Sequence, residues 1–278
     1  MPTRGELVRW GGGQLGASDT PRLDAELLLM AVLGLDRSAL FRDADRLVAA
    51  ADDARYRGLV AARAEGRPVA QLLGVREFWS LEFEVDEHCL VPRPETELLV
   101  ERALAAIPSG AAVRIADLGT GSGAIAVAIA RERPQSRVVA VDVSPAALAV
   151  AARNAARLAP GRVALVRGDW LAAFAPGSFE VIVSNPPYVA ADDPLLTTTE
   201  IRFEPRAALA AGPDGLSDLG ALARQAAAAL VAGGRVFLEH GTTQGPAVRA
   251  LLTAARFADI ATARDLAGHE RVTSGRRP

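Results

Sequence analysis

The sequence has 278 residues, of which 50% are apolar and 23% are charged, a balance that supports a buried core and excludes an intrinsically disordered chain. Its 31 Lys and Arg against 33 Asp and Glu give a formal charge of -2, so no bulk affinity for nucleic-acid phosphates is expected. The single cysteine, Cys89, excludes an internal disulfide. The charged first ten residues and the short apolar stretches predict a cytoplasmic protein without a membrane segment.

The first part of the chain has the apolar spacing of helices. Between residues 22 and 66, apolar side chains recur at intervals of three and four, at Leu23, Leu27, Met30 and Ala31 and again at Tyr56, Leu59 and Val60. We therefore predict a small all-helical domain with a leucine-rich core over residues 1–75. Residues 76–92 alternate apolar and polar side chains from Leu81 onward, which predicts a linker containing a β-hairpin.

Residues 93–278 show the alternation of strands and helices that builds a parallel sheet with helices on both faces, an α/β fold. The predicted strands are Val113–Asp117, Val138–Asp142, Val163–Arg167, Val181–Ser184 and Arg235–Glu239. Helices are predicted from Glu95 to Ala106, from the Ser144 cap to Leu158, and over Ala221–Ala229. Residues 190–216 contain three prolines and predict a long functional loop.

A glycine-rich turn follows the first of these strands and opens a helix. Glycines at such a turn let a ligand approach the backbone closely, at the carboxyl end of the sheet. Gly119, Gly121 and Ala124 also satisfy the dinucleotide-binding pattern, so the turn alone does not choose between a nicotinamide cofactor and S-adenosylmethionine. The predicted cofactor residues of this turn are Asp117, Gly119, Thr120, Gly121, Ser122 and Gly123.

Acidic and aromatic residues at the ends of the next strands complete a cofactor site. Asp142 ends the second strand about twenty residues further on, where a carboxylate accepts hydrogen bonds from ribose hydroxyls. Asp169 and Trp170 follow the third strand, where they can contact the adenine amino group and the ring face; for Trp170 alone, packing in the core is the alternative.

The segment Asn185-Pro186-Pro187-Tyr188 follows the fourth strand and carries the predicted chemistry. An amide nitrogen is a poor nucleophile, so a catalyst must hold its two N-H groups on acceptors and aim its lone pair at a methyl carbon. The Asn185 side-chain oxygen and the Pro186 carbonyl are the two predicted acceptors, and two prolines preorganise that carbonyl. Tyr188 is predicted to stack on the planar substrate group. The motif therefore predicts methyl transfer from S-adenosylmethionine to a planar nitrogen, either an amide or a base amine.

Histidine and cysteine residues give no sign of a metal site. His88, His240, His269 and Cys89 have no metal-ligand spacing, and we expect each of them to be structural.

The chain resembles the release factor glutamine methyltransferases of the PrmC/HemK family nearly from end to end. The resemblance rests on the motifs above and on 22–28 (RLDAELL), 77–79 (EFW), 92–97 (PRPETE), 168–170 (GDW), 204–209 (EPRAAL) and 265–271 (DLAGHER). It implies a class I S-adenosylmethionine-dependent methyltransferase with a seven-stranded sheet, including a late antiparallel strand near residues 270–274. It also implies that residues 1–75 help to dock the substrate, and that Glu95, Thr96 and Arg206 order loops.

The substrate that this resemblance implies is the glutamine of the Gly-Gly-Gln motif in class I peptide chain release factors, methylated on its side-chain nitrogen in connection with translation termination. We expect a monomer that forms no stable complex with nucleic acid or membrane. A DNA or RNA amino methyltransferase remains the first alternative, although the charge balance shows no basic groove. A nicotinamide-dependent dehydrogenase leaves Asn185 to Tyr188 unexplained, and so does a non-catalytic docking protein.

Overall fold

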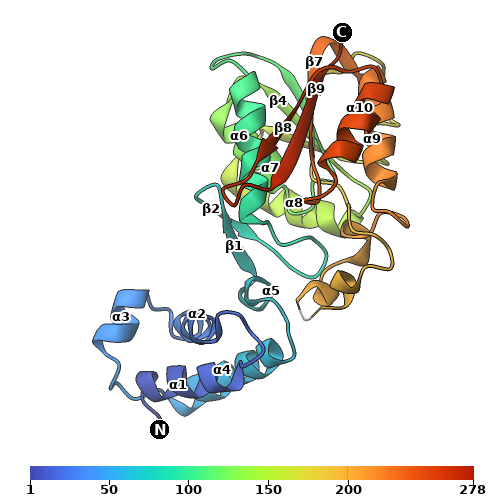
Figure 1. Ribbon diagram of the computed structural model, residues 1–278. Helices are drawn as coiled ribbons and strands as arrows, with labels where there is room; N and C mark the ends of the chain where they lie inside the picture. The colour runs from blue at the N-terminus through green and yellow to red at the C-terminus, as the bar shows by residue number, and fades with distance from the viewer. Residues whose placement is uncertain (199) are drawn as a thin grey trace. The chain divides into compact units, whose positions relative to one another are not determined.

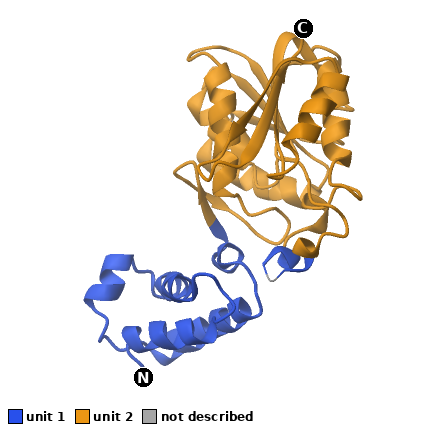
Figure 2. Ribbon diagram, in the orientation of Figure 1, with its two compact units in different colours: residues 1–75, 197–203 blue, residues 76–196, 204–278 orange. Residues whose placement is uncertain are grey.

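The computed structural model describes residues 1–198 and 200–278, which fold into two compact units. The first unit contains Met1–Val75 together with Thr197–Phe203, and the second contains Arg76–Leu196 and Glu204–Pro278 (Figure 2). In the described part of the chain, no helix is long and apolar enough to cross a membrane.

The first unit is helical. Its helices are α1 (Arg4–Gln14), α2 (Pro21–Leu33), α3 (Arg37–Arg42), α4 (Ala50–Ala64) and α5 (Val69–Leu73), with the 3-10 turn η3 (Ile201–Phe203) from the later segment. A capping box begins α1, since the Thr3 hydroxyl accepts from the Glu6 N-H and the Glu6 carboxylate accepts from the Thr3 N-H. Helix α2 ends where Gly34 adopts the left-handed conformation. The core is leucine-rich and also buries Tyr56.

The buried face of α2 differs from the predicted one. Leu23 is 39% exposed and Ala31 is exposed, whereas the buried residues are Asp24, Ala25, Glu26, Leu28, Leu29 and Val32. The cause is an ion pair that the apolar spacing does not reveal. The Asp24 carboxylate lies 2.7 Å from the Arg63 guanidinium and also accepts from two hydroxyls, so a charged residue can face the core.

The predicted loop after the Asn-Pro-Pro-Tyr segment contains three short 3-10 turns, η2 (Pro194–Thr197), η3 and η4 (Arg206–Ala208), and residue 199 lies outside the described residues. Residues 197–203 of this loop belong to the helical unit. There, Glu200 pairs with Arg63, and the Gln71 amide donates to the Phe203 carbonyl at 3.2 Å. Local sequence patterns could not predict this association, because Arg63 and Gln71 lie more than a hundred residues before Glu200 and Phe203 in the sequence.

The second unit contains a hairpin and a seven-stranded sheet. The hairpin pairs β1 (Val75–Phe78) with β2 (Leu81–Glu84). The sheet has the order β5-β4-β3-β6-β7-β9-β8 and is formed by β3 (Arg114–Leu118), β4 (Arg137–Asp142), β5 (Val163–Arg167), β6 (Phe179–Ser184), β7 (Leu230–Glu239), β8 (Ala258–Arg264) and β9 (Glu270–Arg276). Strands β3 to β7 pair in parallel, and β9 is antiparallel to both of its neighbours. The expected α/β fold and its late antiparallel strand are therefore confirmed.

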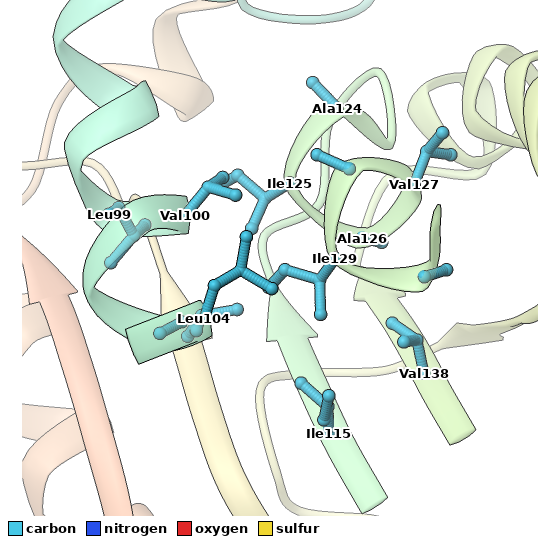
Figure 3. Close-up of a cluster of buried hydrophobic side chains, with 14 of the residues drawn as sticks. Leu99, Val100, Leu104, Ile115, Ala124, Ile125, Ala126, Val127, Ile129 and Val138 are labelled. Atoms are coloured by element: carbon cyan, nitrogen blue, oxygen red, sulfur yellow. The ribbon is translucent and has the colours of Figure 1, made fainter. Parts of the chain in front are cut away.

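Helices cover both faces of this sheet (Figure 1). One layer holds α6 (Glu97–Ala106), α7 (Ala124–Glu132) and α8 (Pro145–Leu158), and the other holds α9 (Ser217–Ala229) and α10 (Gly245–Ala254). Figure 3 shows side chains of α6 and α7, among them Leu104 and Ile129, pointing toward one another over β3 and β4. Helix α8 begins where the sequence predicts, since the Ser144 hydroxyl accepts from the Ala147 N-H at 3.2 Å.

The order of the strands creates a switch point between β3 and β6. The chain runs outward from β3 through β4 to β5 and then returns to β6, which pairs with the other side of β3. The connections on the two sides of this point diverge, leaving a crevice at the carboxyl ends of the strands. The Ser184 hydroxyl donates to the Leu118 carbonyl at 2.7 Å and joins the two strand ends. The predicted cofactor turn and the Asn-Pro-Pro-Tyr segment therefore begin side by side.

Candidate active site

The glycine turn after β3 has a backbone that only glycine adopts readily. Gly119, Gly121 and Gly123 have φ values of +69°, +55° and +82°. A Cβ at Gly123 would lie 3.2 Å from the Cβ of Ala151, so this glycine also permits α7 and α8 to pack closely. The N-H groups of Gly119 and Thr120 both donate to the Val141 carbonyl and hold the turn against β4. The turn is therefore a rigid cradle before a helix.

Asp117 is buried beneath this turn and braces it. One of its carboxylate oxygens accepts from the Thr120 hydroxyl at 2.6 Å and from the Ala126 N-H at 3.1 Å. Burial raises the pKa of Asp117 to about 7, and these hydrogen bonds oppose the rise. Asp117 is fully buried and does not line the cavity described below, so its position suits ordering of the cradle more than direct contact with a ligand.

Asp142 connects the glycine turn to the end of β4. One carboxylate oxygen accepts from the Gly121 N-H at 2.9 Å, and the other accepts from the Ser144 N-H at 2.9 Å. A carboxylate has about four acceptor positions. Two are thus left for hydroxyls of a ligand that lies in the crevice, which is the geometry that binding of a ribose requires.

Trp170 forms a wall of the same crevice. Its backbone has a φ of +48°, a left-handed conformation that is uncommon for a bulky residue. Its ring covers Gly119, where a Cβ would lie 3.2 Å from the ring carbon Cζ3. Asp218, at the start of α9, borders the same crevice, and burial and the neighbouring charge of Asp169 raise its pKa. A side chain on Gly119 would therefore strain the backbone, which has a φ of +69°, and press against the Trp170 ring.

Asn185 lies across the crevice, immediately after β6. Its side-chain nitrogen donates to the Thr96 hydroxyl at 3.1 Å. Its side-chain oxygen is buried and has no hydrogen-bond partner within the residues that the structure describes. An unsatisfied buried acceptor is unfavourable in a folded protein, and a bound N-H donor would satisfy it. The Asn185 oxygen therefore has the position and chemistry of a binding group.

The rest of the segment is held firmly by its surroundings. Pro187 borders the crevice, and Pro186 is buried. The Tyr188 N-H donates to the Leu209 carbonyl at 3.1 Å, and the Gln244 amide donates to the Tyr188 carbonyl at 2.9 Å. The ring of Tyr188 packs partly against the core between the sheet and α9, and burial raises the pKa of its hydroxyl. The predicted stacking of Tyr188 on a substrate remains a prediction.

These elements enclose a cavity of about 460 Å³, within the size range of small-molecule sites. Its walls bring together most of the predicted residues, namely Gly119, Thr120, Gly121, Ser122, Asp142, Asp169, Trp170, Asn185 and Pro187. As far as the structure describes the chain, Asp117, Gly123, Pro186 and Tyr188 are not part of these walls. Asp117 and Gly123 order the glycine turn, and Pro186 and Tyr188 are the sequence neighbours of the lining residues Asn185 and Pro187.

Several lining residues were not predicted from the sequence. His88 and Cys89 border the cavity, and burial raises the pKa of the Cys89 thiol to about 11, so the thiol stays protonated at neutral pH. Arg93 also borders it and pairs with the buried Glu204 at 2.6 Å. Arg93 and Glu204 belong to the Pro-Arg-Pro and Glu-Pro-Arg segments. Both segments carry the family resemblance, and this was the signal in the sequence that could have placed the two residues at the site.

A metal centre does not form in residues 1–198 and 200–278, because no group of three or more His, Cys, Asp or Glu side chains is arranged to hold an ion. The groups that face the cavity are instead a glycine cradle, a carboxylate with free acceptor positions, an aromatic wall and an unsatisfied amide oxygen. This set can bind an adenosyl group at one end and a hydrogen-bond donor at the other.

Comparisons with known proteins identify both parts of the chain. The family model described as "Methyltransferase small domain" matches residues 94–212, and the model described as "PrmC N-terminal domain" matches residues 6–74. A methyltransferase structure from Pyrococcus furiosus superposes with a TM-score of 0.53 at 18% identity, covering 80% of this chain and 97% of that one, which supports the fold.

Two relatives extend the likeness over almost the whole chain. The release factor glutamine methyltransferase of Burkholderia pseudomallei is 51% identical, with 99% of this chain and 96% of that protein covered. The protein of that name from Escherichia coli is 45% identical over 95% of each chain. Identity at this level over both units leaves one conclusion: the chain belongs to the release factor glutamine methyltransferase family.

Proposed function

We propose that this protein transfers the methyl group of S-adenosylmethionine to the side-chain amide nitrogen of the glutamine in the Gly-Gly-Gln motif of class I peptide chain release factors. The observation that carries the proposal is the buried, unpartnered oxygen of Asn185, which shares a cavity with the glycine turn and Asp142. The names of the two relatives support the choice of substrate.

The cofactor end of the cavity suits an adenosyl group. Asp142 has two acceptor positions for ribose hydroxyls, and the turn from Gly119 to Gly123 has no side chain that would block a ligand except those of Thr120 and Ser122. Trp170 offers its ring as a wall, and Asp169 offers a carboxylate for the adenine amino group. When bound there, S-adenosylmethionine supplies an electrophilic methyl group on a positively charged sulfur.

The chain's own contribution to the reaction is positioning and hydrogen bonding. The Asn185 oxygen accepts one N-H of the glutamine amide, and the Pro186 carbonyl accepts the other. Both acceptors draw electron density toward the nitrogen and orient its lone pair along the line of attack. If S-adenosylmethionine were held by the glycine turn and Asp142, its methyl group would pass to the nitrogen and leave neutral S-adenosylhomocysteine, and the nitrogen would release one proton to water through the oxygen that accepts its N-H. A strong general base is not required for this step.

We also propose a role for the helical unit and a cellular context. Residues 1–75 dock the release factor, residues 76–92 link the units, and residues 93–278 carry the reaction. The protein acts in the cytoplasm, where its substrate takes part in translation termination, and we propose that it acts as a monomer.

The test is incubation of the protein with isotopically labelled S-adenosylmethionine and a class I release factor, followed by mass analysis of the modified residue. The matched control is the same release factor with its Gly-Gly-Gln glutamine changed to alanine. We expect one methyl group on the glutamine and none in the control. Equal labelling of the control would refute the substrate, and labelling of RNA instead would support the nucleic-acid alternative.

A further inference from the structure

We propose that Arg93 and Glu204 form an ionic clasp that closes a ring of polypeptide around the substrate end of the cavity and so holds Asn185 to Tyr188 in place. Both are positioning residues, because they act on the substrate through this ring. The inference rests on the proposed function, which assigns the target glutamine to the end of the cavity at Asn185.

The ring consists of three short arms, residues 93–96, 185–188 and 204–209, which we call the collar. All three arms lie in the second unit, and each contributes to the walls of the cavity. The lining residues include Arg93 and Thr96 from the first arm, Asn185 and Pro187 from the second, and Pro205 and Ala208 from the third. The collar therefore surrounds the space where a substrate side chain would meet Asn185.

Two of the joints between the arms are hydrogen bonds. The Asn185 side-chain nitrogen donates to the Thr96 hydroxyl at 3.1 Å and joins the second arm to the first. The Tyr188 N-H donates to the Leu209 carbonyl at 3.1 Å and joins the second arm to the third. The catalytic segment is thus held at both of its ends by the other two arms.

The third joint is the clasp itself. The Arg93 guanidinium donates to the Glu204 carboxylate at 2.6 Å, which closes the ring. The Glu204 side chain is fully buried, whereas 33% of the Arg93 side chain is exposed. A carboxylate buried to this degree needs an opposite charge close by. The pair therefore fixes the beginning of the third arm against the first.

The arms are stiff enough to transmit a displacement. Each contains at least one proline, which restricts the backbone. Residues 94–96 and 206–208 also form 3-10 turns. In these turns the Thr96 N-H donates to the Arg93 carbonyl, and the Leu209 N-H donates to the Arg206 carbonyl, each at 3.1 Å. A shift at one joint is therefore passed to the next arm and is not absorbed within an arm.

The third arm depends most on its joints. Residues 93–96 lead into α6 and residues 185–188 follow β6, whereas residues 204–209 lie within the long loop between β6 and α9. Loss of the clasp would release the Glu204 end of this arm from the cavity wall, and the Leu209 end would then hold Tyr188 less firmly. A misplacement of about 1 Å at a reacting group can cost about 100-fold in rate. The clasp therefore acts on the reaction without contacting the reacting atoms.

The test compares Arg93→Met, Arg93→Lys and the double variant Arg93→Met/Glu204→Gln. Methionine removes the charge, whereas lysine keeps it and can replace a single contact. The double variant removes both charges, so that no buried carboxylate is left without its cation. The matched control is Arg114→Met, because Arg114 and Glu180 also pair at 2.6 Å but lie near the amino ends of β3 and β6, at the edge of the sheet opposite to the site.

We expect Arg93→Met and the double variant each to lower kcat/KM for the release factor by about 10- to 100-fold, with the cofactor Kd within about threefold of wild type. Arg93→Lys should stay within about fivefold of wild type, and Arg114→Met within about twofold. A merely structural pair predicts a different result, since removal of both charges would restore stability and with it activity.

Wild-type activity in the double variant, or equal losses in Arg93→Lys and Arg93→Met, would overturn the proposal. If Arg93→Met fails to fold because Glu204 is left buried beside no cation at that position, the double variant and Arg93→Lys decide.

Hydrogen exchange measures the collar without turnover and separates this inference from the proposed function. The N-H groups of Tyr188 and Val189 both donate to the Leu209 carbonyl. They should exchange at least about tenfold faster in the double variant than in wild type, and at the wild-type rate in Arg114→Met. Faster exchange in a protein that does not methylate release factors would refute the proposed function alone. Methylation together with unchanged exchange in the double variant would refute the clasp alone.

Discussion

Replacement of Asp142 tests the cofactor end of the site most directly. Its carboxylate already accepts from the N-H groups of Gly121 and Ser144, each at 2.9 Å. The two remaining acceptor positions are those that we assign to ribose hydroxyls. Asp142→Ala removes all four, whereas Asp142→Asn keeps one acceptor oxygen and turns an NH2 group toward a donor.

The expected magnitude follows from these contacts. A hydrogen bond to a charged group contributes about 1.5 to 3 kcal/mol, so loss of even one to the ribose weakens binding about tenfold to a hundredfold. The two bonds to Gly121 and Ser144 exist without a ligand, and their loss should destabilise the ligand-free protein by about 1 to 2 kcal/mol. Asp142→Ala should therefore show both effects, and Asp142→Asn should show smaller ones.

Titration calorimetry with S-adenosylmethionine gives the Kd of each variant, and thermal unfolding of the ligand-free proteins reports the second effect separately. Glu101→Gln, an exposed charge on α6, controls for the loss of one negative charge. A Kd for Asp142→Ala within twofold of wild type would remove the ribose assignment, whatever the change in melting temperature.

Three other outcomes follow from the same geometry. Asn185→Ala should lower turnover by more than about 100-fold while cofactor Kd and the circular dichroism spectrum remain near wild type, and near-normal turnover would contradict the mechanism. Gly123→Ala, at a φ of +82° and 3.2 Å from Ala151, should lose about 2 to 4 kcal/mol in urea unfolding, against about 1 to 2 for Gly161→Ala, at a φ of +72° in open space; equal losses would contradict the packing argument. Burial raises the pKa of Asp117 from 3.8 to about 7, so the folded state binds this proton more tightly and the stability it contributes is lost as the pH rises from about 4 through 7. Asp117→Asn should therefore gain on wild type in unfolding free energy by up to about 4 kcal/mol between pH 4 and pH 8, and a constant difference would refute the shift.

Elements with local signals were predicted well from the sequence. Helix α8 was predicted from Ser144 to Leu158 because a Ser cap followed by Pro is a signal within two residues. Strand β6 follows from its apolar run. The buried face of α2 was predicted wrongly, because the pairing of Asp24 with Arg63 depends on residues 39 positions apart. Apolar spacing cannot detect such a pair.

The same distinction applies to the site. The glycine turn, Asp142 and Asn185 each follow a strand directly, so their meeting at one sheet edge could be predicted from the order of elements. Glu239 also ends a strand, but a single Glu in that place gives no signal that it will be buried. The groups around it, Thr96, Tyr188 and Arg271, come from segments far apart in the sequence and meet only after folding.

Glu239 and Asp117 are two buried carboxyl groups near the site that lower the stability of the fold. Both carboxyls are buried near the carboxyl ends of strands, Asp117 in β3 and Glu239 in β7 with β6 between them, and burial raises the pKa of each to about 7. A fold selected for stability alone would replace them with apolar residues, because desolvation of each is unfavourable. Asp117 fixes the backbone of the glycine turn through hydrogen bonds from Thr120 and Ala126, and Glu239 ends β7, the strand beside the one that leads into Asn185. The buried carboxylates of Asp24 and Glu204 lie in ion pairs with Arg63 and Arg93, whereas Asp117 has hydrogen-bond donors from the glycine turn and α7 instead, so its burial breaks a local rule where the cofactor turn needs support.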